Sequence, residues 1–118
     1  MTNPSPLVKD QEALNQRIRD ELSANPVMLY MKGDKTFPQC GFSARVVEIL
    51  NKLGVTYATH DVISDPEVRF GMKNFSNWPT FPQLFVRGEL VGGCDIVSSM
   101  TESGELQNLL KTKGVWNG

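Results

Sequence analysis

The sequence has few of the residues that usually bind metal ions or build disulfide frameworks. Its 118 residues include two cysteines, Cys40 and Cys94, and a single histidine, His60. The spacing of the two cysteines matches no metal-binding motif. Two cysteines without a secretory signal indicate a reducing compartment. We therefore expect a cytoplasmic protein, with the mitochondrial matrix as the alternative.

Long apolar runs and an excess of charge are also lacking. No stretch approaches membrane-spanning length, so no membrane association is expected. The 12 Lys and Arg residues nearly balance the 13 Asp and Glu residues, which argues against a nucleic-acid-binding surface. A hydrophobic content of 40% is ordinary for a soluble globular protein. We predict a disordered leader over residues 1–9, one domain over 10–113 and a short tail over 114–118.

Hydrophobic periodicity predicts four helices and four strands. Leu14, Ile18 and Leu22 recur every four residues and indicate an amphipathic helix. The predicted helices cover 10–24, 43–53, 64 or 65 to 74, and 95–113, and the predicted strands cover 27–32, 55–61, 83–86 and 89–91. The first two strands are joined through a helix and should be parallel, whereas the last two form a hairpin. The predicted fold class is α/β, with a four-stranded mixed sheet and helices on both faces.

The most informative motif is Cys40-Gly41-Phe42-Ser43, at the start of a predicted helix. The positive end of a helix stabilises a thiolate and lowers the thiol pKa. The motif has the layout of a C-x-x-C redox site in which Ser43 replaces the second cysteine. Because a hydroxyl cannot resolve a mixed disulfide, Cys40 must pass its bond to an outside thiol or keep it. A buried structural cysteine is the alternative interpretation, and Gly41, the helix start and nearby Lys32 disfavour it.

Two further segments should lie beside this thiol. Thr80-Phe81-Pro82 leads directly into a strand, and a cis Phe81–Pro82 bond would present the Phe81 backbone to an extended ligand. A simple turn is the alternative. Gly92-Gly93-Cys94-Asp95 opens the last helix, where free N–H groups can bind a carboxylate and Asp95 can pair with an ammonium group. A helix cap without a ligand would explain the same residues.

The candidate cations are Lys32, Arg69 and Lys73, each of which is otherwise a solvated surface charge. Lys32 ends the strand before the motif, and Arg69 and Lys73 share a helix face at i, i+4 spacing. His60 lies in a strand pattern and is interpreted as a structural residue with satisfied hydrogen bonds. We also consider a reversible Cys40–Cys94 disulfide as a hypothesis.

Taken together, these motifs resemble the single-domain CGFS class of monothiol glutaredoxins. The matching segments are 31–33, 38–43, 77–84 and 91–96, and residues 34–37 depart from the small and proline-rich residues common there. The resemblance implies a thioredoxin fold with an extra N-terminal helix, and glutathione as ligand. It assigns Cys40 to the glutathione sulfur and the remaining contacts to Lys32, Arg69, Lys73, Thr80, Phe81, Pro82, Cys94 and Asp95.

The resemblance further implies a [2Fe–2S] cluster, held by Cys40 from each of two subunits and by two glutathione thiolates. The expected function is a cluster carrier that is homodimeric when loaded. Its expected partners are iron–sulfur scaffolds, apo-acceptor proteins and BolA-like proteins. A glutathione-dependent thiol–disulfide oxidoreductase that uses only Cys40 is the alternative. An interaction module with an incidental cysteine is a third, less favoured interpretation.

Overall fold

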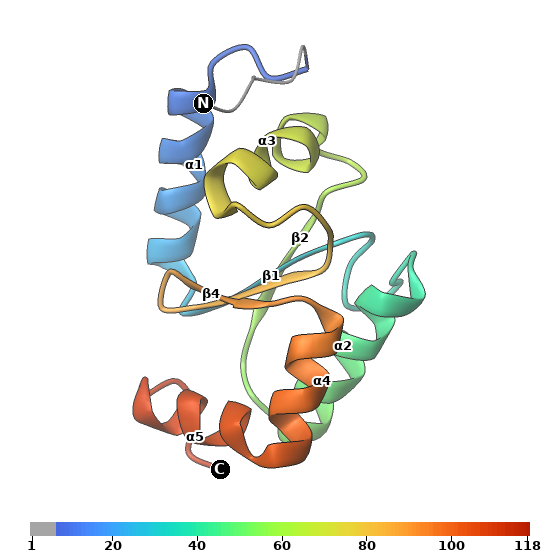
Figure 1. Ribbon diagram of the computed structural model, residues 1–118, viewed down its shortest axis with the longest axis vertical. Helices are drawn as coiled ribbons and strands as arrows, with labels where there is room; N and C mark the ends of the chain where they lie inside the picture. The colour runs from blue at the N-terminus through green and yellow to red at the C-terminus, as the bar shows by residue number, and fades with distance from the viewer. Residues whose placement is uncertain (1–6) are drawn as a thin grey trace.

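The computed structural model describes residues 7–118, and its centre is a mixed β-sheet between two layers of helices (Figure 1). The strands are β1 (Val27–Met31), β2 (Ala58–Asp61), β3 (Gln83–Val86) and β4 (Glu89–Gly92). Their order is β2-β1-β3-β4, with β1 parallel to β2 and the other two pairs antiparallel. This confirms the predicted sheet and fold class.

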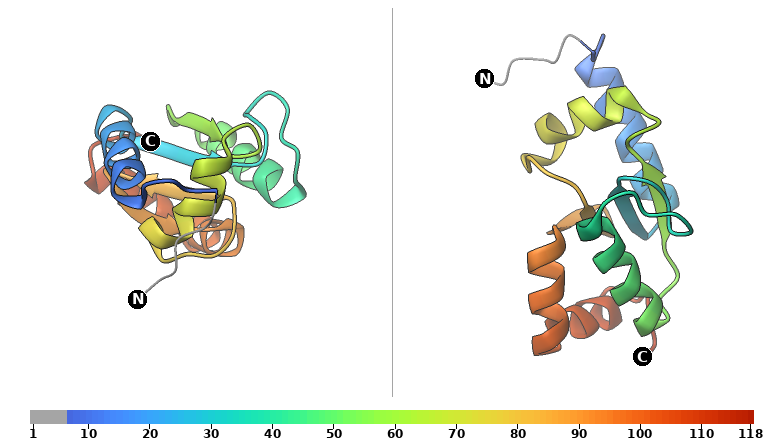
Figure 2. Two further views of the ribbon diagram at one scale, coloured as in Figure 1. Left: turned by 90° about the horizontal axis from the view of Figure 1, so that it is seen from above. Right: turned by 90° about the vertical axis from the view of Figure 1, so that its right-hand side faces the viewer.

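The helices divide between the two faces of the sheet (Figures 1 and 2). They are α1 (Gln11–Ala24), α2 (Gly41–Leu53), α3 (Pro66–Ser76), α4 (Cys94–Ser103) and α5 (Glu105–Thr112). Helices α1 and α3 cover one face, and α2, α4 and α5 cover the other. No helix within residues 7–118 is long and apolar enough to cross a membrane.

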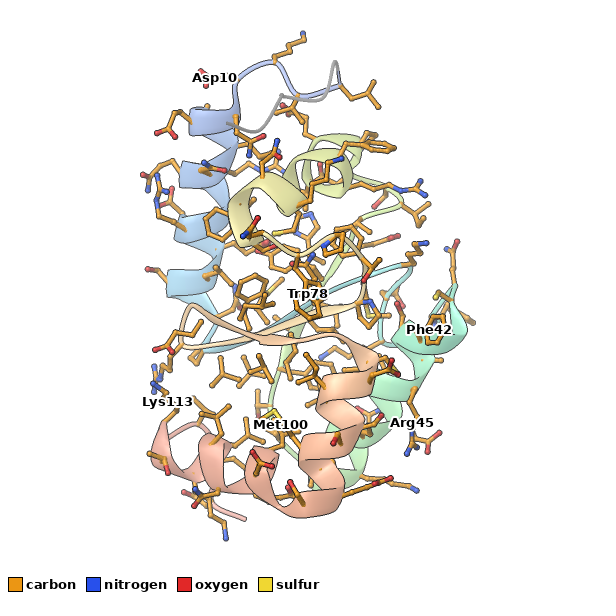
Figure 3. The ribbon with its side chains drawn as sticks, viewed as in Figure 1. Asp10, Phe42, Arg45, Trp78, Met100 and Lys113 are labelled. Atoms are coloured by element: carbon orange, nitrogen blue, oxygen red, sulfur yellow. The ribbon has the colours of Figure 1, made fainter. Side chains whose placement is uncertain are left out.

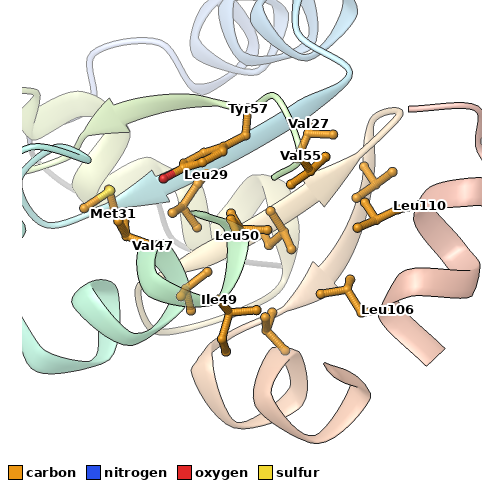
Figure 4. Close-up of a cluster of buried hydrophobic side chains, with 14 residues drawn as sticks. Val27, Leu29, Met31, Val47, Ile49, Leu50, Val55, Tyr57, Leu106 and Leu110 are labelled. Carbon is orange, nitrogen blue, oxygen red and sulfur yellow. The ribbon is translucent and has the colours of Figure 1, made fainter. Parts of the chain in front are cut away.

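The central strand β1 separates two hydrophobic cores. Alternate residues of a strand point to opposite faces of its sheet. Leu29 and Met31 therefore join the core beneath α2, α4 and α5, which Figure 4 shows, whereas Met28 and Tyr30 join the core beneath α1 and α3. All five residues of β1 are buried. The buried end of this strand consequently fixes the position of Lys32, the residue that follows it.

Most predicted bounds agree with the structure to within two residues, and two predicted elements differ by more. The strand predicted over 55–61 pairs only from Ala58 to Asp61, because Val55 and Tyr57 enter the core from an unpaired segment. The helix predicted over 95–113 is two helices, broken at Gly104, where φ is 85°. The break turns α5 so that its buried residues can pack under the sheet.

The core also extends past the predicted domain boundaries. Residues 1–6 of the predicted leader lie outside the described residues, but Val8 is buried in the core beside α1 and α3. At the other end, Trp116 packs against the core beneath α2, α4 and α5. Its Nε1 donates to the carbonyl oxygen of Leu53 at 2.9 Å. Both packed side chains lie outside the predicted 10–113 range.

Candidate functional site

A pocket of about 600 Å³ opens where α2 and α4 begin, with α3 as a third wall. The structure brings every predicted site residue to this one pocket. They are Lys32, Cys40, Arg69, Lys73, Thr80, Phe81, Pro82, Cys94 and Asp95. The wall also contains Phe42, Phe70, Pro79 and Gly93.

Cys40 is the N-cap residue of α2 and is partly exposed in the pocket. The backbone N–H of Ser43 has the largest influence on this thiol and lowers its pKa. Partial burial opposes that effect, while the N–H of Phe42 and the charge of Lys32 lower the thiol pKa further. The direction agrees with the expectation for a thiol at a helix N-terminus. Cys40 is therefore more readily a thiolate than an ordinary cysteine.

Ser43 has a structural role at the position of the absent second cysteine. Its side chain is fully buried, and its Oγ accepts a hydrogen bond from the backbone N–H of Lys32 at 3.2 Å. The contact joins the first turn of α2 to the residue that follows β1. Ser43 thus holds Lys32 and Cys40 at the same pocket.

The loop between Lys32 and Cys40 is held by its own hydrogen bonds. Asp34 Oδ1 accepts from the backbone N–H groups of Thr36 and Phe37, both at 2.8 Å. Lys35 Nζ donates to the carbonyl oxygen of Tyr57 at 2.7 Å and lies over the Tyr57 ring. The loop nevertheless leaves the Phe37 side chain 74% exposed.

The segment before β3 contains the predicted cis peptide bond between Phe81 and Pro82. The fully buried side chain of Gln83 holds this segment, because its Nε2 donates to the carbonyl oxygens of Trp78 at 3.0 Å and Thr80 at 3.1 Å. Figure 3 labels Trp78, which lies on the segment between α3 and β3. The supporting role of Gln83 was not predicted, since no sequence pattern reveals such contacts.

Gly93, directly before α4, allows close contact with the segment that contains Pro82. A Cβ on Gly93 would lie 3.2 Å from the carbonyl oxygen of Pro82. Gly93 is the N-cap of α4, so the first helical residues are Cys94 and Asp95. N–H groups in a first helical turn lack intrahelical partners and can bind an anion.

Opposite charges lie on different walls of the pocket. Lys32, Arg69 and Lys73 come from the end of β1 and from α3, whereas Asp95 comes from α4. None of the three cations takes part in an ion pair within residues 7–118. The arrangement suits a ligand with a carboxylate at one end and an amino-acid group at the other.

The two cysteines are both free and line the same pocket. The reversible Cys40–Cys94 disulfide stays a prediction. His60 lies outside the pocket and has hydrogen-bond partners on both ring nitrogens, which confirms its interpretation as a satisfied structural residue.

The sheet order, the thiol of lowered pKa at the start of α2 and the cis-proline segment beside it define a thioredoxin-fold protein whose motif carries one cysteine. The sequence model of the Glutaredoxin family matches residues 27–91. The chain belongs to the glutaredoxin family, and within it to the monothiol glutaredoxins.

Its relatives include single-domain and much longer proteins. Glutaredoxin 4 of Haemophilus ducreyi is 47% identical over 102 residues, which cover 86% of this chain and 95% of that protein. Monothiol glutaredoxin-S11 of rice is 50% identical over 105 residues, which cover 89% of this chain. This chain spans only 21% of the rice protein and 30% of Glutaredoxin 3 of Danio rerio.

Solved structures agree with the fold. Reduced poplar apo GrxS14 is 42% identical, with a TM-score of 0.76 over 85% of this chain and 92% of that chain. A buckwheat glutaredoxin–glutathione complex is 23% identical, with a TM-score of 0.80 over 91% of this chain and 96% of that chain. The second likeness is one of fold.

Proposed function

We propose that this monothiol glutaredoxin is a glutathione-dependent carrier of [2Fe–2S] clusters in iron–sulfur protein maturation. The observation that carries the proposal is the partly exposed thiol of Cys40, with a lowered pKa, in a pocket that has cations on one side and Asp95 on the other. Such a pocket combines a soft metal ligand with a binding site for a charged peptide.

Glutathione matches the charges and the backbone of this pocket. Its glycine carboxylate would meet Lys32, Arg69 and Lys73, and its γ-glutamyl end would meet the start of α4 and Asp95. Thr80, Phe81 and Pro82 would flank its cysteinyl residue, which places the glutathione sulfur toward Cys40. The proposed ligand thus brings a second thiolate to the protein thiolate.

The cluster is cargo in this proposal, and the thiolate count determines how it is held. A [2Fe–2S] cluster usually takes four thiolates. The motif provides Cys40, while Ser43 is buried and hydrogen-bonded to the backbone. No group of three or more His, Cys, Asp or Glu side chains in the described part of the chain is arranged to hold a metal ion. Two chains and two glutathione molecules would complete the set.

A carrier must also be able to release its cargo. Half of the proposed ligands belong to glutathione, which only non-covalent contacts hold in the pocket. Exchange of these ligands would allow transfer from a scaffold protein to an apo-acceptor. BolA-like proteins are proposed as further partners on the grounds of the family resemblance.

The lowered thiol pKa of Cys40 favours a second candidate, a glutathione-dependent thiol–disulfide oxidoreductase. In that reaction the Cys40 thiolate attacks the glutathione sulfur of a glutathionylated protein, and the protein thiolate leaves. A second glutathione thiolate then attacks the Cys40–glutathione disulfide. Oxidised glutathione leaves, and the Cys40 thiolate is restored.

Anaerobic reconstitution with iron, sulfide and glutathione tests the carrier function. We expect a visible absorbance spectrum of a [2Fe–2S] cluster and the mass of a dimer by light scattering. The Cys40→Ser variant should remain a colourless monomer, and the Cys94→Ser variant is the matched control that should load normally. If the unaltered protein stays a colourless monomer, the carrier proposal is wrong. Loss of the cluster in Cys94→Ser would refute the two-glutathione ligand set.

A further inference from the structure

His60, the single histidine, contacts a carboxylate with each of its ring nitrogens. Its Nδ1 lies 2.9 Å from both carboxylate oxygens of Glu21 on α1, and its Nε2 lies 2.7 Å from Oδ2 of Asp65 at the start of α3. An ionised carboxylate only accepts hydrogen bonds, and a neutral imidazole has one N–H. Both contacts are hydrogen bonds only when the ring carries two protons. The geometry is therefore that of an imidazolium cation.

Carboxylates outnumber permanent cations in the cluster around His60. From β1, the Tyr30 hydroxyl donates to Glu21 Oε1 at 2.7 Å, and the Tyr30 ring lies 5.3 Å from that of His60. From α1, Arg17 pairs with Asp65. From α3, Glu67 Oε1 lies 3.8 Å from Arg17 Nη1 and adds a carboxylate beside the cluster. Two carboxylates thus contact His60, and a third lies near Arg17, the permanent cation of the cluster.

The titration of this cluster follows from those contacts. The hydrogen bond to Glu21 has the largest influence on the His60 pKa and raises it, burial lowers it, and Asp65 raises it again, so the net shift is upward from 6.5. For Asp65, burial opposes ionisation, but hydrogen bonds from His60 and Val68 lower its pKa overall. The His60 contribution to stability is complete below its unfolded pKa and is lost as the pH rises through its folded pKa.

Asp65 connects this cluster to the pocket. Its Oδ1 accepts from the backbone N–H of Val68 at 3.4 Å and caps α3, and its carbonyl oxygen accepts from the backbone N–H of Arg69 at 2.9 Å. Arg69 and, one turn later, Lys73 line the pocket. The helix turn that carries the pocket's arginine therefore begins at the carboxylate that His60 binds.

We propose that His60 is a positioning residue for the pocket. As an imidazolium it fixes the capped first turn of α3, and with it Arg69. An anionic peptide thiol therefore binds less tightly once His60 has lost its proton. The inference rests on the proposed glutathione site. Nδ1 faces both oxygens of Glu21, and that hydrogen bond has the larger influence on the His60 pKa, so the neutral ring keeps its Nδ1 proton. Loss of the Nε2 proton then turns the contact with Asp65 into a repulsion between lone pairs. The first turn of α3 then loses one of its attachments to β2.

The test uses S-methylglutathione, which cannot exchange with thiols, and the full chain with Cys40→Ser, which removes the titration of that thiol. Affinity is measured by calorimetry between about pH 6 and pH 8.5, where both ligand carboxylates stay ionised. The ring C–H resonances of His60, the single histidine, report its protonation in the same samples by NMR.

We expect the affinity to fall by at least about fivefold as the pH rises, which is the lower end of ordinary coupling between sites. The midpoint of this fall should coincide with the midpoint of the His60 titration. His60→Phe should bind weakly with a flat profile over that range. His60→Arg, which keeps a permanent cation, should retain the tighter binding of the low-pH state without the decline. Affinity that stays constant while the imidazole titrates would overturn the inference, and so would an unchanged profile in His60→Phe.

Amide hydrogen exchange separates this inference from the proposed function. We expect the protection of the Val68 and Arg69 amides in the ligand-free protein to fall through the same midpoint. Protection that does not change would overturn the positioning role. No binding of S-methylglutathione at any pH would overturn the glutathione site and the ligand half of the inference, while the exchange data would still decide whether His60 holds α3. The pH series of affinity and of amide exchange are both measured on protein in which His60 is intact, and the two His60 variants serve as controls for the affinity.

Discussion

At the scale of single residues, the reactivity of Cys40 depends first on the backbone at the start of α2. The N–H of Ser43 lowers the thiol pKa most, and the charge of Lys32 makes a smaller contribution from the end of β1. The Lys32 side chain is therefore a part of the site that can be removed without altering the helix. The backbone N–H of Lys32, which holds Ser43, would stay in place.

Lys32→Met should raise the pKa of the Cys40 thiol, because it removes a positive charge that favours the thiolate. The rise should be only part of the total shift, since the Ser43 N–H remains. The measurement is the pH midpoint of alkylation by iodoacetamide in a Cys94→Ser background, so that a single thiol reacts. Lys52→Met is the control, because Lys52 is exposed in the last turn of α2 and should leave the midpoint unchanged.

Most of the pocket's residues could be predicted because each belongs to a local motif with a direct chemical meaning. Cys40 precedes a helix, Asp95 follows two glycines, and Pro82 precedes a strand. Gln83 and Phe70 carry no such signal. Their positions depend on how the segment before β3 and the face of α3 pack together, which sequence periodicity alone does not specify.

At the scale of elements, the loop before Cys40 turns at Gly33, whose φ is 87°. A Cβ there would lie 2.4 Å from the carbonyl oxygen of Phe37 and 2.7 Å from the backbone nitrogen of Gln39. Both are backbone atoms, so no side-chain rotation can relieve the contact. The close approach of Gly33 to the backbone of Phe37 and Gln39 therefore requires glycine at this position.

Gly33→Ala should consequently lose more stability than Gly54→Ala, which is a matched control. Gly54 also has a positive φ, of 73°, but a Cβ there would meet nothing within 4 Å. Gly54→Ala should lower the free energy of unfolding by about 1–2 kcal/mol, the usual value for a left-handed alanine. Gly33→Ala should exceed that value and should also slow Cys40 alkylation. Equal unfolding midpoints in urea for the two variants would contradict this account.

The helix break at Gly104 could not be predicted from the sequence pattern. Val97, Leu106 and Leu110 are all buried in one core, so their apolar spacing gives no sign of an interruption. A glycine within a helical pattern is often tolerated. Here it takes a φ of 85° and redirects the chain, because α5 must turn to cover the sheet. That requirement arises only from the assembled fold.

At the scale of the whole molecule, the order of strands and helices up to α4 was predictable, and it determines which parts meet. One parallel crossover and one hairpin leave β1 and β3 as the central strands. The segments that precede or follow these strands then share one edge with the starts of α2 and α4. Residues from positions as distant as 32 and 95 consequently line one pocket.

Phe42 is 63% exposed beside Cys40, on the outer side of α2 in Figure 3. Phe42→Ser should leave the unfolding free energy of the cluster-free protein within about 0.5 kcal/mol, as for most surface substitutions. In the proposed cluster-bridged dimer this ring would be covered, and covered aromatic rings contribute strongly to interfaces. The loaded variant should therefore dissociate at a severalfold higher protein concentration when dilution is followed by light scattering. Arg45→Ser, which removes an exposed side chain one turn away, is the control and should dissociate like the unaltered protein. An identical dilution midpoint for Phe42→Ser and the unaltered protein would remove Phe42 from the interface.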